Sequence, residues 1–296
     1  ILHENIQYLK PVFGRGDDEY QQMATKVLDW IKQLSGQDEV VMAQGSATFA
    51  LELAAHSFIK GKVLLVSTGY YSDRLQRLLP EECELEVISY DDLENIQGEF
   101  DWVLCAYTET SNAFKVDLST VKIKVDQLGA RLYVDATGSI GLESQHELAD
   151  VMAFSSCKGL FGLTGACFVA HKKNLPKKSL SNFYFNLETH ENKMVTGPYH
   201  TVASLYGVME KHDELVHRVK NSKYQVLTDW GKYIDRESTN QPLLCTYLHA
   251  KVDAIDDQTV MYEPRSDLPG SIVCHFGEIH HDNVQITHRL KIKELN

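Results

Sequence analysis

Short apolar runs alternate with amphipathic stretches along most of the chain. Over 17–34, apolar residues recur at spacings of three and four, which predicts a helix that Gly36 ends. The runs that follow are nearly continuous, which is typical of strands buried on both faces of a sheet. They lie at 39–44, 62–67, 83–88, 102–107, 132–134, 151–154 and 166–170. Because helical stretches separate them, the pattern favours a three-layer α/β domain.

The pattern changes in the last third of the chain. A helical stretch at about 202–234 carries an interrupted apolar stripe, and it predicts a long helix that links two domains. We expect a large domain over 17–212 and a small α+β domain over 213–296, after an N-terminal segment, 1–16, without a clear element. The small domain should hold strands at 243–248, 260–262 and 271–276 and a final helix from His281.

Composition narrows the class of protein. The chain has 296 residues, of which 43% are hydrophobic and 24% are charged, as in ordinary globular proteins. A net charge of −12 disfavours nucleic acid or an anionic membrane as a partner, since both need a basic face. No apolar run reaches the length of a membrane span. The six cysteines show no metal-binding spacing, and adjacent His280 and His281 point apart, so we expect reduced thiols, a cytoplasmic location and no metal site.

The most specific chemical pattern lies at 131–170. The apolar run 132–134 ends in Asp135, and the run 151–154 leads through Ser155 to Lys158 and a glycine-rich turn. Alone, such an Asp is usually a cap and such a Lys is usually solvated. Together they place an acid and an amine at the ends of neighbouring strands, as pyridoxal phosphate requires. A lysine amine forms a Schiff base with its aldehyde, and a carboxylate keeps its ring nitrogen protonated.

This segment, VDA…SSCKGL.G..G, resembles the active-site signature of pyridoxal-phosphate-dependent transaminases of fold type I, class V. It is most similar to 2-aminoethylphosphonate:pyruvate and alanine:glyoxylate aminotransferases. The likeness runs over about 15–284 and is densest over 44–201. It implies a large domain with a mixed, mostly parallel sheet, the cofactor pyridoxal 5′-phosphate, and catalytic roles for Lys158 and Asp135.

Further cofactor contacts come from the same resemblance. A small-residue turn that opens a helix at 45–48 can bind phosphate through free N–H groups, although an ordinary N-cap explains it equally well. In the family this segment cradles the cofactor phosphate, with help from a serine at the position of Ser155. Aromatic, small and hydroxyl residues contact the ring. The cofactor-binding residues implied in this chain are Gly45, Ser46, Ala47, Thr48, Tyr71, Thr110, Ser111, Asp135, Thr137, Ser155 and Lys158.

The segment 194–201 resembles a family segment that crosses a two-fold interface to the neighbouring subunit's cofactor phosphate. Thr196, Tyr199 and Thr201 are therefore implied contacts to the partner's site, although a Gly-Pro turn that begins a helix explains the same residues. The resemblance thus implies a homodimer with shared active sites.

Two parts of the family pattern are absent. Residues 1–16 contain no counterpart of the Pro-Gly-Pro segment that lines the family's substrate site, so we expect that part to be missing. The arginine that binds the substrate's acidic group is replaced by Ile272, and Arg265, Arg15 or His275 are the candidate substitutes.

The resemblance implies an aminotransferase that moves an amino group from a small primary amine or amino acid to a 2-keto acid such as pyruvate or glyoxylate. The donor would be similar to 2-aminoethylphosphonate or alanine. Because the arginine is missing, a lyase, desulfurase or decarboxylase of the same fold stays open. So does a non-catalytic relative that acts as a binding module.

Overall fold

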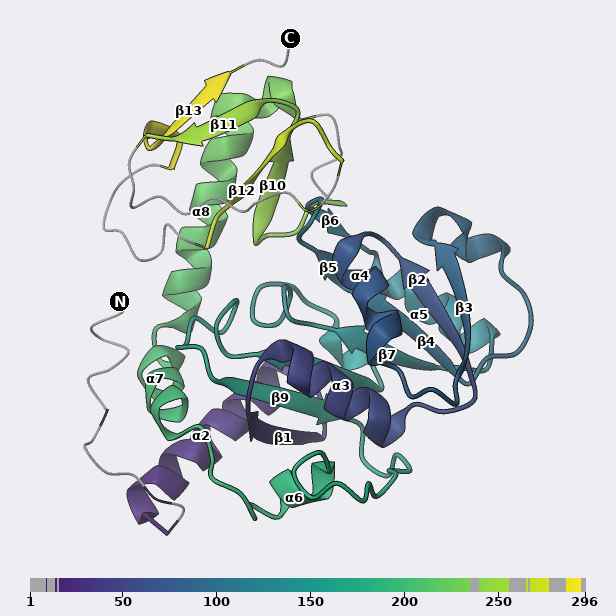
Figure 1. The fold of residues 1–296 in the computed structure, drawn as a ribbon. Coiled ribbons are helices and arrows are strands. Elements are labelled where there is room, and N and C mark those ends of the chain that lie inside the picture. The colour runs from purple at the N-terminus through teal and green to yellow at the C-terminus, as the bar shows by residue number, and fades with distance from the viewer. Residues whose placement is uncertain are drawn as a thin grey trace.

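The large part of the molecule is built around one seven-stranded sheet (Figure 1). The computed structural model describes residues 9, 14, 16–234, 240–255, 265, 267–276 and 286–293. The strands follow one another across the sheet in the order β1 (Glu39–Gln44), β9 (Ala166–His171), β8 (Val151–Ser155), β7 (Arg131–Asp135), β4 (Trp102–Ala106), β2 (Lys62–Ser67) and β3 (Glu84–Ser89). Only β9 runs antiparallel to its neighbours in this sheet. The predicted mixed, mostly parallel sheet is therefore confirmed.

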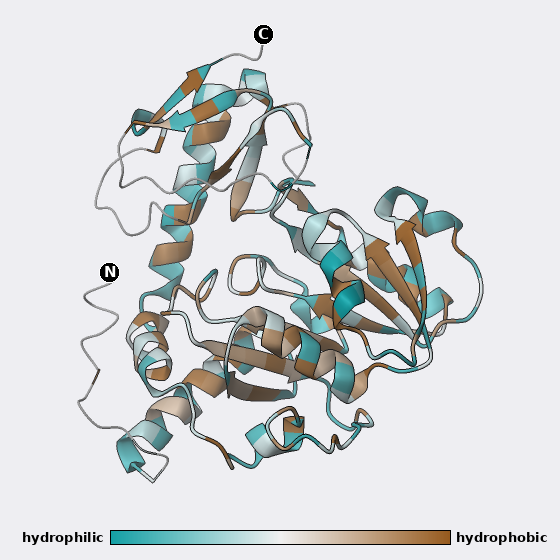
Figure 2. Ribbon diagram, in the orientation of Figure 1, coloured by the Kyte–Doolittle hydropathy of each residue, from teal (hydrophilic) through white to brown (hydrophobic). Residues whose placement is uncertain are grey.

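Helices cover both faces of the sheet because side chains of successive strand residues point to opposite sides. Leu64 and Val66 pack with helices α2 (Asp18–Ser35) and α5 (Leu118–Gln127) in one buried cluster. Val63 and Leu65 pack on the other side with helix α3 (Ala47–Phe58). In Figure 2 the central strands are mostly hydrophobic, whereas the covering helices have polar residues among the apolar ones. These are the three layers that the sequence predicts.

Helix α2 begins and ends where its sequence signals lie. The Asp17 carboxylate accepts hydrogen bonds from the backbone N–H groups of Glu19 and Tyr20, which have no partner inside the helix. Gly36 takes the left-handed conformation, with φ of 60°, and ends the helix.

The predicted linking helix is two helices. Helix α7 (Tyr199–Met209) and helix α8 (His212–Trp230) are separated at 210–211. His212 begins α8, and its Nε2 donates to the carbonyl oxygen of Gly159 at 2.7 Å. The start of α8 is thereby attached to the turn that follows β8. Figure 1 shows α8 rising from this point toward the small C-terminal sheets.

The C-terminal part contains two antiparallel strand pairs. Strand β10 (Cys245–Leu248) pairs with β12 (Ser271–Cys274), and β11 (Lys251–Ala254) pairs with β13 (Leu290–Lys293). The sequence indicated β10 and β12 but missed the short strands β11 and β13. The strand expected at 260–262 and most of the final helix lie outside the described residues. Where the structure describes that helix again, it has a 3₁₀ turn, η7 (Ile286–His288), and then β13, so the helix prediction is wrong there.

The remaining elements are short. They are α4 (Tyr70–Leu75), η1 (Gln76–Leu78), η2 (Tyr90–Asn95), β5 (Thr108–Glu109), β6 (Phe114–Lys115), η3 (His146–Leu148), α6 (Leu187–Glu191) and η4 (Gly231–Tyr233). Among the described residues, no helix has both the length and the apolar character needed to cross a membrane.

One close backbone contact fixes the turn after β7 against the turn after β8, and it can be tested with a matched pair of glycines. Gly141 and Gly129 both have positive φ, of 75° and 68°. A Cβ at Gly141 would lie 2.6 Å from the Gly159 carbonyl oxygen, whereas a Cβ at Gly129 would meet no atom within 4 Å.

We expect Gly129→Ala to lower the free energy of unfolding by about 1–2 kcal/mol, because alanine is strained in this conformation. Gly141→Ala adds overpacking to the same strain, so its loss should exceed that of Gly129→Ala by about 1–3 kcal/mol. Urea denaturation followed by circular dichroism measures both. Equal losses would show that the two turns do not hold each other as the structure indicates.

Candidate active site

The residues that the sequence singled out gather at one edge of the sheet. Strands β1, β2, β4, β7 and β8 are parallel, so their carboxyl ends meet there. The segments that leave these ends are 45–48, 68–71, 107–111, 135–137 and 155–158. Every residue predicted to contact the cofactor within one subunit therefore lies at this edge, a placement that follows from the strand directions alone.

Asp135 ends β7 between two alanines. In the strand register it pairs with Ala106 on β4 and Ala153 on β8, so small side chains flank it. The carboxylate is 5% exposed and accepts a hydrogen bond of 2.9 Å from the N–H of Thr137. Burial, with the nearby Asp135 charge as a second cause, raises the pKa of the Cys105 thiol to about 12. A buried acid at this edge is the group that the sequence predicts.

Lys158 lies half-buried in the turn that follows β8. Its Nζ is 5.6 Å from the ring centroid of Tyr71, which belongs to the neighbouring helix α4. The turn is held by its own backbone, since Phe161 N–H donates to the Lys158 carbonyl oxygen at 2.8 Å. The Ser156 hydroxyl donates to the Leu163 carbonyl oxygen at 2.6 Å. The structure thus brings together the predicted amine and the predicted aromatic residue from separate parts of the chain.

Glu109 is a site residue that the sequence analysis missed. It is fully buried, and its Oε2 accepts hydrogen bonds from the N–H groups of Tyr71 and Ser72 at 2.9 and 3.0 Å. Its Oε1 accepts from the N–H of Ser111 at 3.1 Å and from the Ser111 hydroxyl at 2.5 Å. Burial raises the pKa of Glu109, and these hydrogen bonds oppose that rise. The position of Glu109, an acid close after the predicted strand over 102–107, is the sequence signal that could have identified it.

Several threonines at this edge have buried hydroxyl oxygens without a hydrogen-bond partner in the described part of the chain. They are Thr68, Thr108 and Thr137. Gly138 lies against Thr108 and Thr110, since a Cβ there would meet their side chains at 3.1 and 3.4 Å. Buried polar atoms are normally paired. Unused hydroxyls at one sheet edge indicate a place that takes a polar ligand.

The predicted phosphate-binding segment is the first turn of α3. Ser46 is the N-cap, and its Oγ accepts from Phe49 N–H at 3.4 Å. The N–H of Gly45 donates to the Gly165 carbonyl oxygen at 3.0 Å and is therefore already used. Ala47 and Thr48 follow in the first turn, where N–H groups lack acceptors inside the helix. Ser155 is buried, with its Oγ 3.5 Å from the Cys157 sulfur.

The three residues implied as contacts to a partner subunit have different surroundings. Thr196 is exposed. The Tyr199 ring packs edge-on against the Tyr20 ring, with centroids 4.5 Å apart. The Thr201 hydroxyl donates to the Thr164 carbonyl oxygen at 3.0 Å. Their role toward a partner stays a prediction.

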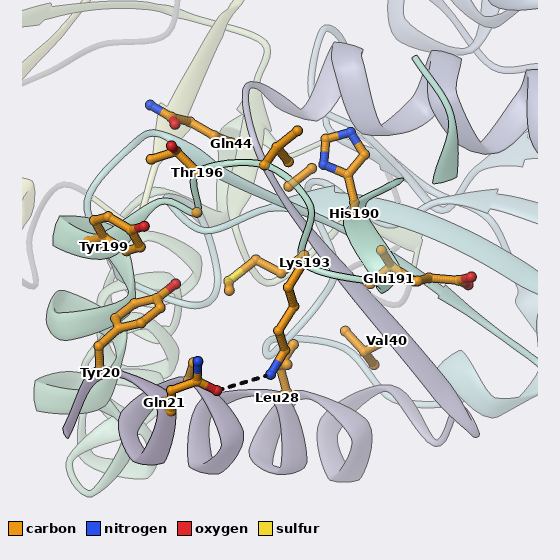
Figure 3. A pocket seen from close by; sticks show the side chains of 16 residues that line it. Tyr20, Gln21, Leu28, Val40, Gln44, His190, Glu191, Lys193, Thr196 and Tyr199 are labelled. Atoms are coloured by element: carbon orange, nitrogen blue, oxygen red, sulfur yellow. Dashed lines mark hydrogen bonds between the residues drawn. The ribbon is translucent and has the colours of Figure 1, made fainter. Parts of the chain in front are cut away.

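Thr196 and Tyr199 also line a pocket of about 160 Å³ beside β1, between α2 and the segment 190–199 (Figure 3). The pocket is mostly apolar, and its lining includes Gln44 at the end of β1. Lys193 reaches across one side of it to Gln21, with 3.5 Å between Nζ and Oε1. Neither Lys158 nor Asp135 lines this pocket, so it is distinct from the site around Tyr71.

Strands β10 and β12 of the C-terminal part lie near the site. Cys245 on β10 lies near enough to Lys158 and Glu109 for both charges to act on its thiol, whose pKa is raised chiefly by burial. Ile272, at the expected arginine position, is buried with Ala113, Cys245 and Tyr247. Position 272 thus packs over the site but carries no charge.

The prediction that His275 could replace the missing arginine is wrong. It is fully buried, with its ring nitrogens 3.1 Å from the Ser222 hydroxyl and 2.8 Å from the Thr246 hydroxyl. Burial lowers the pKa of His275 to about 3, so the ring is neutral near pH 7. Arg15 lies outside the described residues, and Arg265 lies against Tyr70 and Tyr71.

Comparisons with known proteins confirm the resemblance and the fold. No family model matches the chain. The chain is 29% identical over 236 residues to a 2-aminoethylphosphonate–pyruvate transaminase of Pseudomonas fluorescens, an alignment that covers 68% of this chain and 63% of that protein. The chain therefore spans less than two thirds of the length of that relative.

Solved structures share the fold at low sequence identity. A pyridoxamine–pyruvate aminotransferase from Mesorhizobium loti superposes with a TM-score of 0.75 at 16% identity, over 93% of this chain and 84% of that one. An alanine–glyoxylate aminotransferase from Nostoc sp. gives a TM-score of 0.70 at 18% identity, over 86% and 76% of the two chains. The fold of this chain is that of these aminotransferases.

The buried Glu109 carboxylate can be tested with an isosteric change. In Glu109→Gln, an NH₂ group replaces one of the two carboxylate oxygens. It faces either the N–H groups of Tyr71 and Ser72 or the N–H group of Ser111, so buried donors lose their acceptor. We expect the free energy of unfolding to fall by about 1–3 kcal/mol.

Glu84→Gln on the exposed side of the edge strand β3 is the control, and it should change stability by less than about 0.5 kcal/mol. Chemical denaturation of both variants gives the comparison. If Glu109→Gln were as harmless as the control, the carboxylate would not be holding the two segments together.

Proposed function

We propose that the protein is a pyridoxal-phosphate-dependent aminotransferase. It moves an amino group from a small primary amine or amino acid to a 2-keto acid such as pyruvate or glyoxylate. The observation that carries this proposal is the position of Lys158, which faces the Tyr71 ring and leaves the strand next to the one that Asp135 ends. The names of the transaminase relative and of the aminotransferases with the same fold support it.

The residues present fit the cofactor. A buried acid flanked by alanines, a lysine over an aromatic ring and unused buried hydroxyls suit a flat polar ring, and the first turn of α3 suits a phosphate. When bound, pyridoxal phosphate supplies an aldehyde carbon that carries the amino group and a ring that accepts electrons from the substrate carbon.

The chain's own residues divide the remaining work. Lys158 holds the cofactor covalently through Nζ, and as a free amine it moves a proton to and from the substrate carbon. The Asp135 carboxylate keeps a proton on the ring nitrogen. The Tyr71 ring fixes the plane of the cofactor and excludes water, while Thr48 and Ser155 bind the phosphate. The Glu109 carboxylate positions Tyr71 by accepting a hydrogen bond from the backbone N–H of Tyr71.

Lyase, desulfurase or decarboxylase chemistry on the same cofactor is the alternative, because Ile272 leaves the usual substrate arginine absent. Stoichiometric conversion of a keto acid into its amino acid separates a transaminase from these enzymes. A chain that binds the cofactor without any turnover would be a non-catalytic relative.

Lys158→Ala tests the proposal. Borohydride reduction of the wild type should attach the mass of the cofactor to the peptide that contains Lys158, and the variant should show no such peptide. Amino transfer by the variant should fall on the order of 10²–10⁴-fold, because the proton shuttle is lost. Mass spectrometry and a keto-acid assay give the two readouts.

Lys60→Ala, at an exposed lysine after α3, is the control and should retain both the labelled peptide and the rate. A wild-type protein whose reduced form carries no cofactor on Lys158 would end the proposal.

We also propose that the protein works as a cytoplasmic homodimer with shared active sites. The apolar pocket beside β1 is lined by Thr196 and Tyr199, the residues expected to reach a partner. Phe183, Tyr184 and Met194 are exposed close to them in the chain, at 56%, 44% and 47%. A group of exposed large apolar side chains is typical of an interface. The described cysteines are all free, as in a reducing compartment.

Light scattering on a sizing column should give twice the mass of one chain. Met194→Glu places a charge in the expected interface, so we predict a shift toward the monomer and a parallel loss of activity. Tyr224→Glu, at a comparably exposed apolar residue on α8, should stay dimeric. A wild-type protein that is monomeric and fully active would contradict the shared site.

A further inference from the structure

Arg265 lies against the rings of Tyr70 and Tyr71, the first two residues of α4. Its Cζ is 5.0 Å from the Tyr70 ring centroid and 5.8 Å from the Tyr71 ring centroid. The two rings are perpendicular, with centroids 5.2 Å apart. Both distances are within the range in which a guanidinium is attracted to an aromatic ring. The arginine is therefore held at this place although its side chain is exposed.

The same ring also has Lys158 as a neighbour. Because Lys158 Nζ lies 5.6 Å from the Tyr71 centroid and Arg265 Cζ lies 5.8 Å from it, the two charged groups are at most about 11 Å apart. A small molecule with an amine at one end and an acidic group at the other can have its ends directed to these two positions. The amine end would be directed to Lys158, where the reaction takes place, and the acidic end to Arg265.

Residues that follow Arg265 in the chain pack against β10 and β12. Leu268 packs on Ile272 and its buried neighbours Cys245 and Tyr247. At Gly270 the chain passes so close to β10 that a Cβ would lie 2.0 Å from the Leu248 carbonyl oxygen. The chain is thus packed against β10 from Leu268, three residues after Arg265.

The charges around Tyr71 are unbalanced. Arg74 has its Cζ 5.1 Å from the Tyr71 centroid, so three cationic side chains approach one ring. Within the described residues, none of the three forms an ion pair, and Arg74 Nε is buried without a hydrogen-bond partner. The nearby Glu109 carboxylate is already occupied by backbone N–H groups and a hydroxyl.

The protein as a whole carries a net charge of −12, so its general composition does not explain three cations at one ring. A local group of cations on an acidic protein attracts and concentrates anions. The position where the family has its arginine is filled by buried Ile272, and His275 is neutral. Of the three replacements that the sequence suggested, Arg15, Arg265 and His275, Arg265 is the one that the described residues place at the same ring as Lys158.

We propose that Arg265 binds the acidic group of the amine substrate and so takes over the task of the arginine missing at position 272. The substrate class is then a primary amine that carries a phosphonate or a carboxylate, since a guanidinium can bind either group through two parallel hydrogen bonds. This inference rests on the proposed aminotransferase function and specifies its donor.

The test compares two donors and two arginine variants in the cofactor-loaded enzyme. The donors are 2-aminoethylphosphonate and ethylamine, which lacks the acidic group. Arg265→Gln should raise KM for 2-aminoethylphosphonate roughly 10- to 100-fold, because a hydrogen-bonded charge pair is lost. Its kcat should stay nearly constant, since the interaction is equal in the ground and transition states.

For ethylamine, Arg265→Gln should leave kcat/KM unchanged. Arg77→Gln, an exposed arginine on η1, removes the same charge elsewhere and should behave as the wild type with both donors. Arg265→Lys restores the charge without the paired donors, so it should recover only part of the affinity. Titration calorimetry with methylphosphonate provides a readout without turnover, and its binding should weaken in Arg265→Gln by the same factor as KM.

Equal KM values in Arg265→Gln and Arg77→Gln, or an equal loss with ethylamine, would overturn the assignment of Arg265. Failure of the proposed function has a different signature, in which the wild type transfers no amino group from either donor. In that case methylphosphonate binding still decides whether Arg265 is an anion site. Unchanged methylphosphonate affinity in Arg265→Gln would refute it.

Discussion

The buried Glu109 carboxylate is the interaction on which the site depends most. The ends of β2 and β4 are separate chain segments, and nothing in a parallel sheet itself fixes how the loops beyond two strand ends sit on each other. Glu109 joins them, because its two oxygens bind the backbone of Tyr71 and Ser72 on one side and Ser111 on the other. The position of the Tyr71 ring is therefore set by backbone hydrogen bonds, and Lys158 and Arg265 are both positioned relative to that ring.

Much of the fold was predictable from sequence because its signals are local. The apolar runs gave the sheet strands, and Asp17 and Gly36 marked the ends of α2. Asp135 was found because it ends a run that is buried on both faces, and Lys158 because it lies in the glycine-rich turn after another such run. Strands β11 and β13 were missed because, unlike the equally short β10 and β12, they bury few of their side chains and so lack a continuous apolar run. The break between α7 and α8 depends on a distant contact, from His212 to Gly159, which no local pattern contains.

The parts of the site that sequence reasoning missed are those that depend on distant contacts. Glu109 looks like an ordinary polar residue after a strand until its carboxylate is seen to bind residues 37 and 38 positions away. Arg265 looks like a surface arginine in the sequence, and its contacts with Tyr70 and Tyr71, almost 200 residues earlier, appear only in the structure. Conversely, His275 looked available in the sequence, yet it is completely buried between the hydroxyls of Ser222 and Thr246.

Arg265 lies outside the seven-stranded sheet that positions Asp135 and Lys158. The site edge is built from strand ends whose residues are closely packed between two layers of helices. Arg265 lies instead on a connection before β12 and is joined to the core at Leu268. Under the proposed assignment of Arg265, substitutions at this residue would select another donor while Lys158 and Asp135 stay in place. With these proposed roles, substrate preference and reaction chemistry would depend on separate parts of the chain and could evolve independently.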